Sequence, residues 1–197
     1  MADSKITGLP SSSTLDGTEA LALVQGGVTK QAPLNEVRGS GFIDYNDSAT
    51  TTTPITLVAG TWTTITNDGL GSFTNKSYPP AGVTELMDTS TGAFDPTELS
   101  FGDTMLIRND FTITPNTNNT LLELRYQLGT GGGAYTLEKI INRLDSGSGI
   151  QYRFSLEPDL IYMGDSNTRD NPIVLQVKLS GNGTLVNAGS AITVVAR

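Results

Sequence analysis

Carboxylates are the side chains of this sequence whose chemistry could support catalysis. The chain of 197 residues has no His and no Cys, which removes the commonest general base, any thiolate nucleophile and the commonest transition-metal ligands. A glycosidase needs two carboxylates held across a sugar, and the candidates are Asp44, Asp47, Asp103 and Asp110. Nothing in the sequence places any two of them together, and ordinary turn chemistry explains each. We therefore expect that the protein is not an enzyme.

Two other groups of residues could bind a ligand. Residues 164–171 offer the carboxylate and amide oxygens that calcium prefers. They lack the Asp-x-Asp-x-Asp-Gly spacing and the terminal Glu, so a solvated surface turn without metal or cofactor is expected. Trp62, Phe73 and Tyr78 could stack on a sugar, although isolated aromatic residues more often lie in a core or a subunit interface. Tyr78 is the candidate for glycan contact, because the prolines after it hold it in a loop.

Composition excludes several classes of partner. The net charge of −8 repels phosphate backbones, so we expect no nucleic-acid partner. No stretch approaches the roughly 20 apolar residues of a membrane span, so no membrane partner is expected. The first five residues lack the apolar core of a signal peptide. The sequence thus predicts synthesis in a cytoplasm, followed by release through lysis or within a larger particle.

Alternating apolar and polar residues indicate an all-β domain over residues 54–197. In residues 120–128 the even-numbered apolar residues face one side, and Glu123, Arg125 and Gln127 face the other. Similar runs lie at residues 104–113, 150–157, 173–179 and 191–196. About eight such strands, separated by Gly, Asn, Asp and Pro, predict an antiparallel jelly-roll sandwich. The charged residues Glu123, Arg125, Arg153 and Lys178 fit either a solvated face or a polar subunit interface.

Three segments of this domain need separate interpretation. Residues 54–65 are predicted to form a hairpin around Ala59-Gly60. Residues 135–144 fit a strand or a helix, and the turn-rich flanks, including the glycine-rich hairpin tip at 129–133, favour a strand. The irregular stretch 67–102 is long enough to be functional or to contain a short strand, such as residues 83–87.

The N-terminal 38 residues differ in character from the rest. Gly26-Gly27, between two short β-prone runs, predicts a tight hairpin. Residues 33–38 read as one helical turn with Pro33 at its start. A segment of this size cannot bury enough surface to be stable alone. Residues 39–53 are predicted to be a linker or an extended tract, with Gly39-Ser40-Gly41 as a flexible joint.

Four pieces of this N-terminal segment occur in an order known from phage proteins: Lys5-Ile6-Thr7-Gly8-Leu9-Pro10, Leu15-Asp16-Gly17-Thr18-Glu19, Leu21-Ala22-Leu23-Val24-Gln25 and Gly27-Val28-Thr29-Lys30. The ordered set resembles a short module near the start of bacteriophage tail-fibre, baseplate and head-fibre proteins. That resemblance implies attachment of this end to the virion, often as a trimer. The residues expected to make the anchoring contacts are Ile6, Leu9, Pro10, Leu21, Leu23, Val24 and Leu34.

The C-terminal domain resembles the trimeric, tumour-necrosis-factor-like jelly rolls of phage decoration and fibre-head proteins. The likeness rests on strand number, Gly-Asp-Thr at 102–104, Thr-Leu-Leu-Glu-Leu at 120–124 and the final apolar strand. Together these resemblances imply a capsid decoration or head-fibre protein on the virion surface. It would be a homotrimer bound to the major capsid protein or another virion protein. The alternative is a short tail fibre whose β domain recognises host surface glycan, with Tyr78 and the 67–102 loop as its binding residues.

Overall fold

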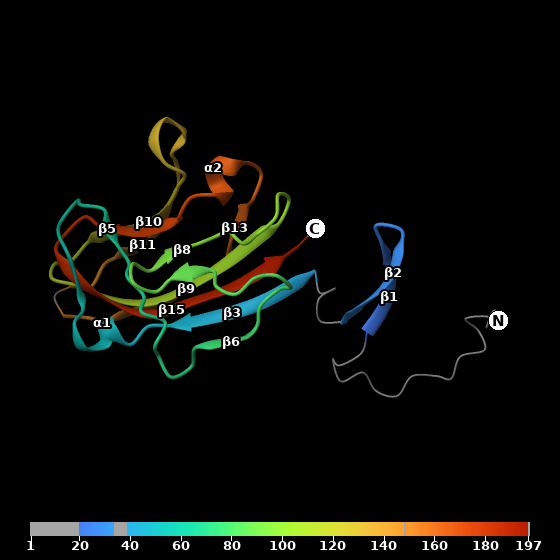
Figure 1. Ribbon diagram of the computed structural model, residues 1–197. Helices are drawn as coiled ribbons and strands as arrows, with labels where there is room; N and C mark the ends of the chain where they lie inside the picture. The colour runs from blue at the N-terminus through green and yellow to red at the C-terminus, as the bar shows by residue number, and fades with distance from the viewer. Residues whose placement is uncertain (1–19, 34–38, 148, 197) are drawn as a thin grey trace, which may run out of the picture. The chain divides into compact units, whose positions relative to one another are not determined.

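The structure is a computed structural model that describes residues 20–33, 39–147 and 149–196 (Figure 1). It divides into two compact units, Met1–Arg38 and Gly39–Arg197. Almost all regular structure in the described residues is antiparallel β-sheet, and the two α-helices and one 3-10 helix are a single turn each. The expected all-β class is therefore confirmed.

The first unit contains one β-hairpin, as the Gly-Gly pair predicts. Strands β1 (Ala20–Gln25) and β2 (Val28–Pro33) pair along their full length. Gly26 and Gly27 form the turn with φ of 63° and 77°, the doubly positive combination that suits the twist of a two-residue hairpin. The helical turn expected after Pro33 lies outside the described residues.

The second unit is an antiparallel sandwich of two sheets. The larger sheet has the order β12-β9-β15-β3-β6, with β13 continuing β12 along β9 and β4 continuing β3 along β15. Its strands are β3 (Ser40–Asn46), β4 (Ile55–Leu57), β6 (Asn75–Tyr78), β9 (Thr104–Pro115), β12 (Tyr152–Ser155), β13 (Asp159–Tyr162) and β15 (Gly183–Val195). We call it the large sheet.

The smaller sheet has the order β11-β10-β14-β5. It consists of β5 (Thr63–Thr64), β10 (Thr120–Leu128), β11 (Tyr135–Leu144) and β14 (Val174–Leu179). The remaining elements are α1 (Ala49–Thr52), the pair β7 (Met87–Asp88) and β8 (Ala93–Phe94), the 3-10 turn Gly131–Gly133, and α2 (Ser166–Arg169). Residues 135–144 are thus a strand, as their flanks predict.

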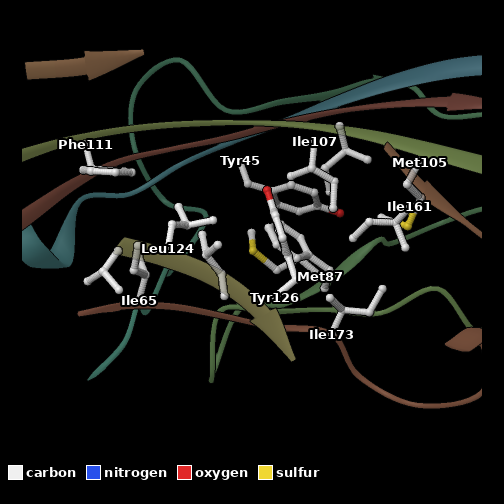
Figure 2. Packing of buried hydrophobic residues seen from close by; sticks show 14 of the residues in the cluster. Tyr45, Ile65, Met87, Met105, Ile107, Phe111, Leu124, Tyr126, Ile161 and Ile173 are labelled. Carbon is white, nitrogen blue, oxygen red and sulfur yellow. The ribbon is translucent and has the colours of Figure 1, made fainter. Parts of the chain in front are cut away.

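The core lies between the two sheets, as Figure 2 shows. From β10 come Leu122, Leu124, Tyr126 and Leu128, all buried, while the residues between them are only partly buried. The large sheet contributes residues such as Ile43, Ile107 and Ile192. The same alternation in β14 buries Leu175, Val177 and Leu179. The period-two patterns predicted these inward faces correctly.

One chain of hydrogen bonds crosses this apolar core. Ser190 Oγ donates to Asn109 Oδ1 (2.8 Å), and Asn109 Nδ2 donates to the Tyr126 hydroxyl (2.6 Å). That hydroxyl donates to Asp159 Oδ2 (3.0 Å), and Lys139 Nζ lies 2.6 Å from Asp159 Oδ1. Burial raises the pKa of Tyr126, and the neighbouring Asp159 raises it further, so the phenol stays protonated. This series of hydrogen bonds links the two sheets and ends at the edge strands β11 and β13.

The predicted hairpin at 54–65 is wrong. Gly60 does sit in a turn, with φ of 70° and a hydrogen bond from Thr61 N to Val58 O. The flanking strands, however, enter different sheets: β4 pairs with β15, and β5 pairs with β14. The turn therefore carries the chain from the large sheet to the small one.

Residues 39–53 are not a linker, although residues 40–46 are extended. Ser40 to Asn46 form β3, which pairs with β15 on one side and with β6 on the other. Gly41 serves close packing rather than flexibility, because a Cβ there would lie 2.2 Å from the backbone nitrogen of Pro80. The sandwich thus begins at Gly39, not at residue 54.

The irregular stretch 67–102 contains short strands, but of the expected strand at 83–87 only Met87 belongs to one, at the start of β7. Strand β6 adds an edge to the large sheet, and β7 and β8 form a small ribbon. Its first part, residues 67–74, folds back on the end of β3: Gly71 N donates to Asn46 O (2.9 Å). This contact positions the groove described below.

Candidate functional site

Two of the candidate catalytic carboxylates are tied into local turns. Asp47 is buried and accepts hydrogen bonds from Thr50 N (2.8 Å) and Asp68 N (3.0 Å). Asp103 is buried and accepts one from Ser100 N (2.8 Å). Both carboxylates hold backbone in place, which is the turn chemistry expected of them.

The other two carboxylates lie near each other on the outer face of the large sheet. Burial raises the pKa of Asp44, the positive charge of Arg108 lowers it, and the negative charge of Asp110 raises it. Arg108 Nη2 forms an ion pair with Asp110 Oδ2 at 3.0 Å. The sequence alone did not reveal this proximity. We call Asp44, Arg108 and Asp110 the charged row.

Residues 164–171 form a capped helical turn. The Asp165 side chain accepts a hydrogen bond from Thr168 N (2.8 Å) at the start of α2. Arg169 pairs with Asp170 and lies 4.0 Å from the centre of the Phe101 ring. Among the described residues, no group of three or more acidic side chains is arranged to hold a metal ion.

Trp62 packs on the outer face of the small sheet. Arg125 and Lys178 both lie over its ring, at 4.4 and 4.6 Å from the centroid. The same two cations pair with Glu138 and Glu123 of their own sheet. These charges therefore interact within one chain, and the Trp62 ring already contacts two cations.

Tyr78, the candidate for glycan contact, belongs to an apolar row that crosses the whole large sheet. Neighbouring members are register partners on adjacent strands and share the outer face. In order they are Leu160, Leu106, Thr193, Phe42 and Tyr78. We call these five residues the apolar row; Leu160 and Tyr78 at its ends are more than half exposed.

A second row beside it extends the apolar surface. Tyr162 pairs with Thr104, which pairs with Val195. Tyr162 and Val195 are both about half exposed. A tyrosine side chain that is half exposed leaves roughly 100 Å² of its surface in solvent. The two rows together therefore expose several hundred Å² of largely apolar surface. A contiguous apolar patch of that size is a candidate interaction surface.

A groove of about 530 Å³ opens at the other end of the same sheet face. Its base includes Asn46 at the end of β3 and Val186 and Ala188 of β15. Leu70 and Phe73 stand at its margin and are 77% and 82% exposed. We call it the Phe73 groove. Sequence reasoning named Phe73 but preferred Tyr78, since exposure of an aromatic residue is not visible in a single sequence.

Three of the seven predicted anchoring residues fall within the described part of the chain. Ile6, Leu9, Pro10 and Leu34 lie outside the described residues. Leu21 and Leu23 belong to β1, though their side chains are not among those described, and Val24 is exposed. An isolated two-stranded hairpin is at best marginally stable in water, so the prediction that this segment needs a partner stays a prediction.

Comparisons with known proteins give no family. No protein-family model and no curated protein matches the chain. Among solved structures, it is similar to infectious bursal disease virus of the Gt strain (TM-score 0.40, 11% identity, 96% of this chain and 42% of that chain). The Gx strain gives a TM-score of 0.39 with 12% identity over 95% of this chain and 40% of that one. The virus's VP2 subviral particle gives 0.39 and 11% over 95% and 41%.

The chain thus spans less than half the length of these viral proteins. In the part of the chain that the structure describes, no helix is long and apolar enough to cross a membrane. The function proposed below rests on the residues of this chain.

Proposed function

We propose that this chain is a non-enzymatic structural protein of a bacteriophage virion, a capsid decoration or head-fibre protein. Residues 1–38 dock on the capsid shell, through the major capsid protein or another virion protein. The sandwich is displayed outward as a homotrimer. The protein is made in the bacterial cytoplasm and ends on the virion surface.

The division into two unequal units carries this proposal. Among the described residues, every member of the buried core cluster lies between Ile43 and Val194, so the sandwich has a core of its own. The described part of the N-terminal unit is one hairpin with two exposed valines, Val24 and Val28. A small unit that cannot bury its apolar residues alone is suited to dock on a larger surface. Its sequence resembles modules with that role.

The apolar row and its neighbour support association of the sandwich with copies of itself. Their residues come from five strands and lie beside the charged row on one face of the sheet. Three copies joined there would combine three weak anchors into one strong attachment, because docking of the first raises the effective concentration of the others.

Removal of residues 1–38 tests the proposal. The truncated protein should remain folded, with the melting temperature of the full chain's sandwich, and should no longer co-sediment with virions that lack this protein. The full chain is the positive control. Undiminished virion binding by the truncated protein would refute attachment through the N-terminus.

A further inference from the structure

The loop that carries Leu70 and Phe73 is fixed before any ligand binds. Asn46 N donates to Thr74 Oγ1 (3.0 Å), and Gly71 N donates to Asn46 O. A Cβ at Gly71 would lie 2.6 Å from the Asn46 Cβ, so the loop packs closely on the end of β3. Two large apolar side chains are therefore held in solvent by a hydrogen-bonded loop, which reduces the entropy lost on binding.

The groove below these side chains is lined by hydroxyl groups. Thr51 and Ser72 are exposed at the groove. Ser48 Oγ donates to Asp68 (2.7 Å) and Thr52 Oγ1 donates to Ala49 O (3.0 Å), so each oxygen keeps lone pairs that can accept. An apolar platform beside neutral hydroxyls matches the two sides of a sugar ring, which has C–H faces and hydroxyl edges.

The charges of the groove select against anionic ligands. Of the described residues that line it, none is Lys or Arg, and Asp47 is the one carboxylate. Asp47 is buried and already accepts hydrogen bonds from Thr50 N, Thr50 Oγ1 and Asp68 N. The net charge of −8 repels anions. The volume of about 530 Å³ is within the range of small-molecule sites, roughly 300–1,000 Å³.

We propose that the Phe73 groove binds a neutral saccharide unit of a cell-surface glycan, with the sugar ring stacked on Phe73 and in contact with Leu70. This activity goes beyond virion attachment and moves the glycan contact from Tyr78 to the opposite end of the large sheet. A decorated virion would then carry many weak sugar sites, and their number would strengthen adhesion to a cell.

The test uses the full-length protein on an array of neutral and acidic glycans, followed by ligand-observed NMR to measure the affinity of single oligosaccharides. Wild type should bind neutral glycans. Phe73→Ala and Leu70→Ala should weaken the affinity at least tenfold without changing the melting temperature, because both side chains are largely exposed. Phe101→Ala is the matched control, since Phe101 is an exposed aromatic residue outside the groove. Tyr78→Ala should also keep its affinity.

Three results would overturn the saccharide site: no binding to any neutral glycan, binding to acidic glycans alone, or unchanged affinity in both Phe73→Ala and Leu70→Ala. A parallel measurement with phosphatidylcholine vesicles identifies the competing occupant. Vesicle binding that Phe73→Ala abolishes, with a blank array, would assign the groove to lipid. Virion attachment is measured on the same variants and tests the proposed function separately. If the variants still attach to virions but no glycan binds, the saccharide site is refuted and the proposed function is not.

Discussion

Substitution of Leu160 by Glu should separate the proposed trimer into monomers. Leu160 is 61% exposed in the single chain, and full burial of a leucine contributes roughly 1.5–3 kcal/mol. Burial of the Leu160 side chain against a second copy should therefore stabilise the assembly by about 1–2 kcal/mol. A carboxylate buried in its place without a partner adds several kcal/mol of cost. The lost burial and the added cost of the carboxylate together make at least about 4 kcal/mol. The dissociation constant of the assembly should therefore rise about a thousandfold.

Sedimentation equilibrium over roughly 1–100 μM protein measures this change on the full chain. Wild type should be trimeric and Leu160→Glu monomeric, with similar thermal unfolding of the sandwich at low concentration. Val58→Glu is the matched control, because Val58 is as exposed but lies in the turn before β5. Monomeric wild type, or a Leu160→Glu trimer as stable as wild type, would refute the assignment of this surface.

Two stability predictions concern polar groups of the sandwich. Tyr126→Phe removes the hydroxyl that joins Asn109 to Asp159 and should lower the free energy of unfolding in urea by about 1–3 kcal/mol; an unchanged midpoint would contradict a stabilising role. Asp44→Asn should raise that free energy at pH 7, because the folded state raises the pKa of Asp44 and so disfavours its ionised form. The gain should vanish near pH 2–3, where the carboxyl is protonated in both states, and a loss at pH 7 would show that attraction to Arg108 outweighs burial.

Period-two patterns predicted the inward faces because burial on one side of a sheet forces that alternation. In β10 the buried residues from Leu122 to Leu128 are those that the sequence assigned to one face. The Gly26-Gly27 hairpin was predictable for another local reason, since few residues other than Gly accept two successive positive φ values.

Strand partners could not be predicted in the same way. Around Ala59-Gly60 the local pattern is that of a hairpin, yet Leu57 pairs with Gly183 and Thr63 pairs with Val177. These partners lie more than a hundred residues away, and local alternation contains no information about which distant strand is adjacent. For the same reason β3 could not be predicted from the sequence. Its pairing with β15 and β6 is what makes residues 40–46 part of the sheet rather than a linker.

The candidate surfaces had a weaker signal in the sequence. Leu106 lies between the buried residues Met105 and Ile107, and Leu160 and Tyr162 flank the buried Ile161. Apolar residues on both faces of a strand predict that its outer face also takes part in a contact. The assembly of the apolar row from five strands could be seen only in the structure, because its members are spread from residue 42 to residue 193.

The outer face of the large sheet can serve both proposed roles because its two ends differ. Phe42 of the apolar row and Asn46 of the Phe73 groove are four residues apart on β3, or roughly 13 Å at the rise of a strand. The charged row lies between them, and its ions would cost energy if they were buried between subunits without partners. A contact between copies should therefore stop at the charged row and leave the groove open. Self-association and saccharide binding then become separable: Leu160→Glu should abolish the first while preserving monovalent sugar affinity, and Phe73→Ala should do the reverse.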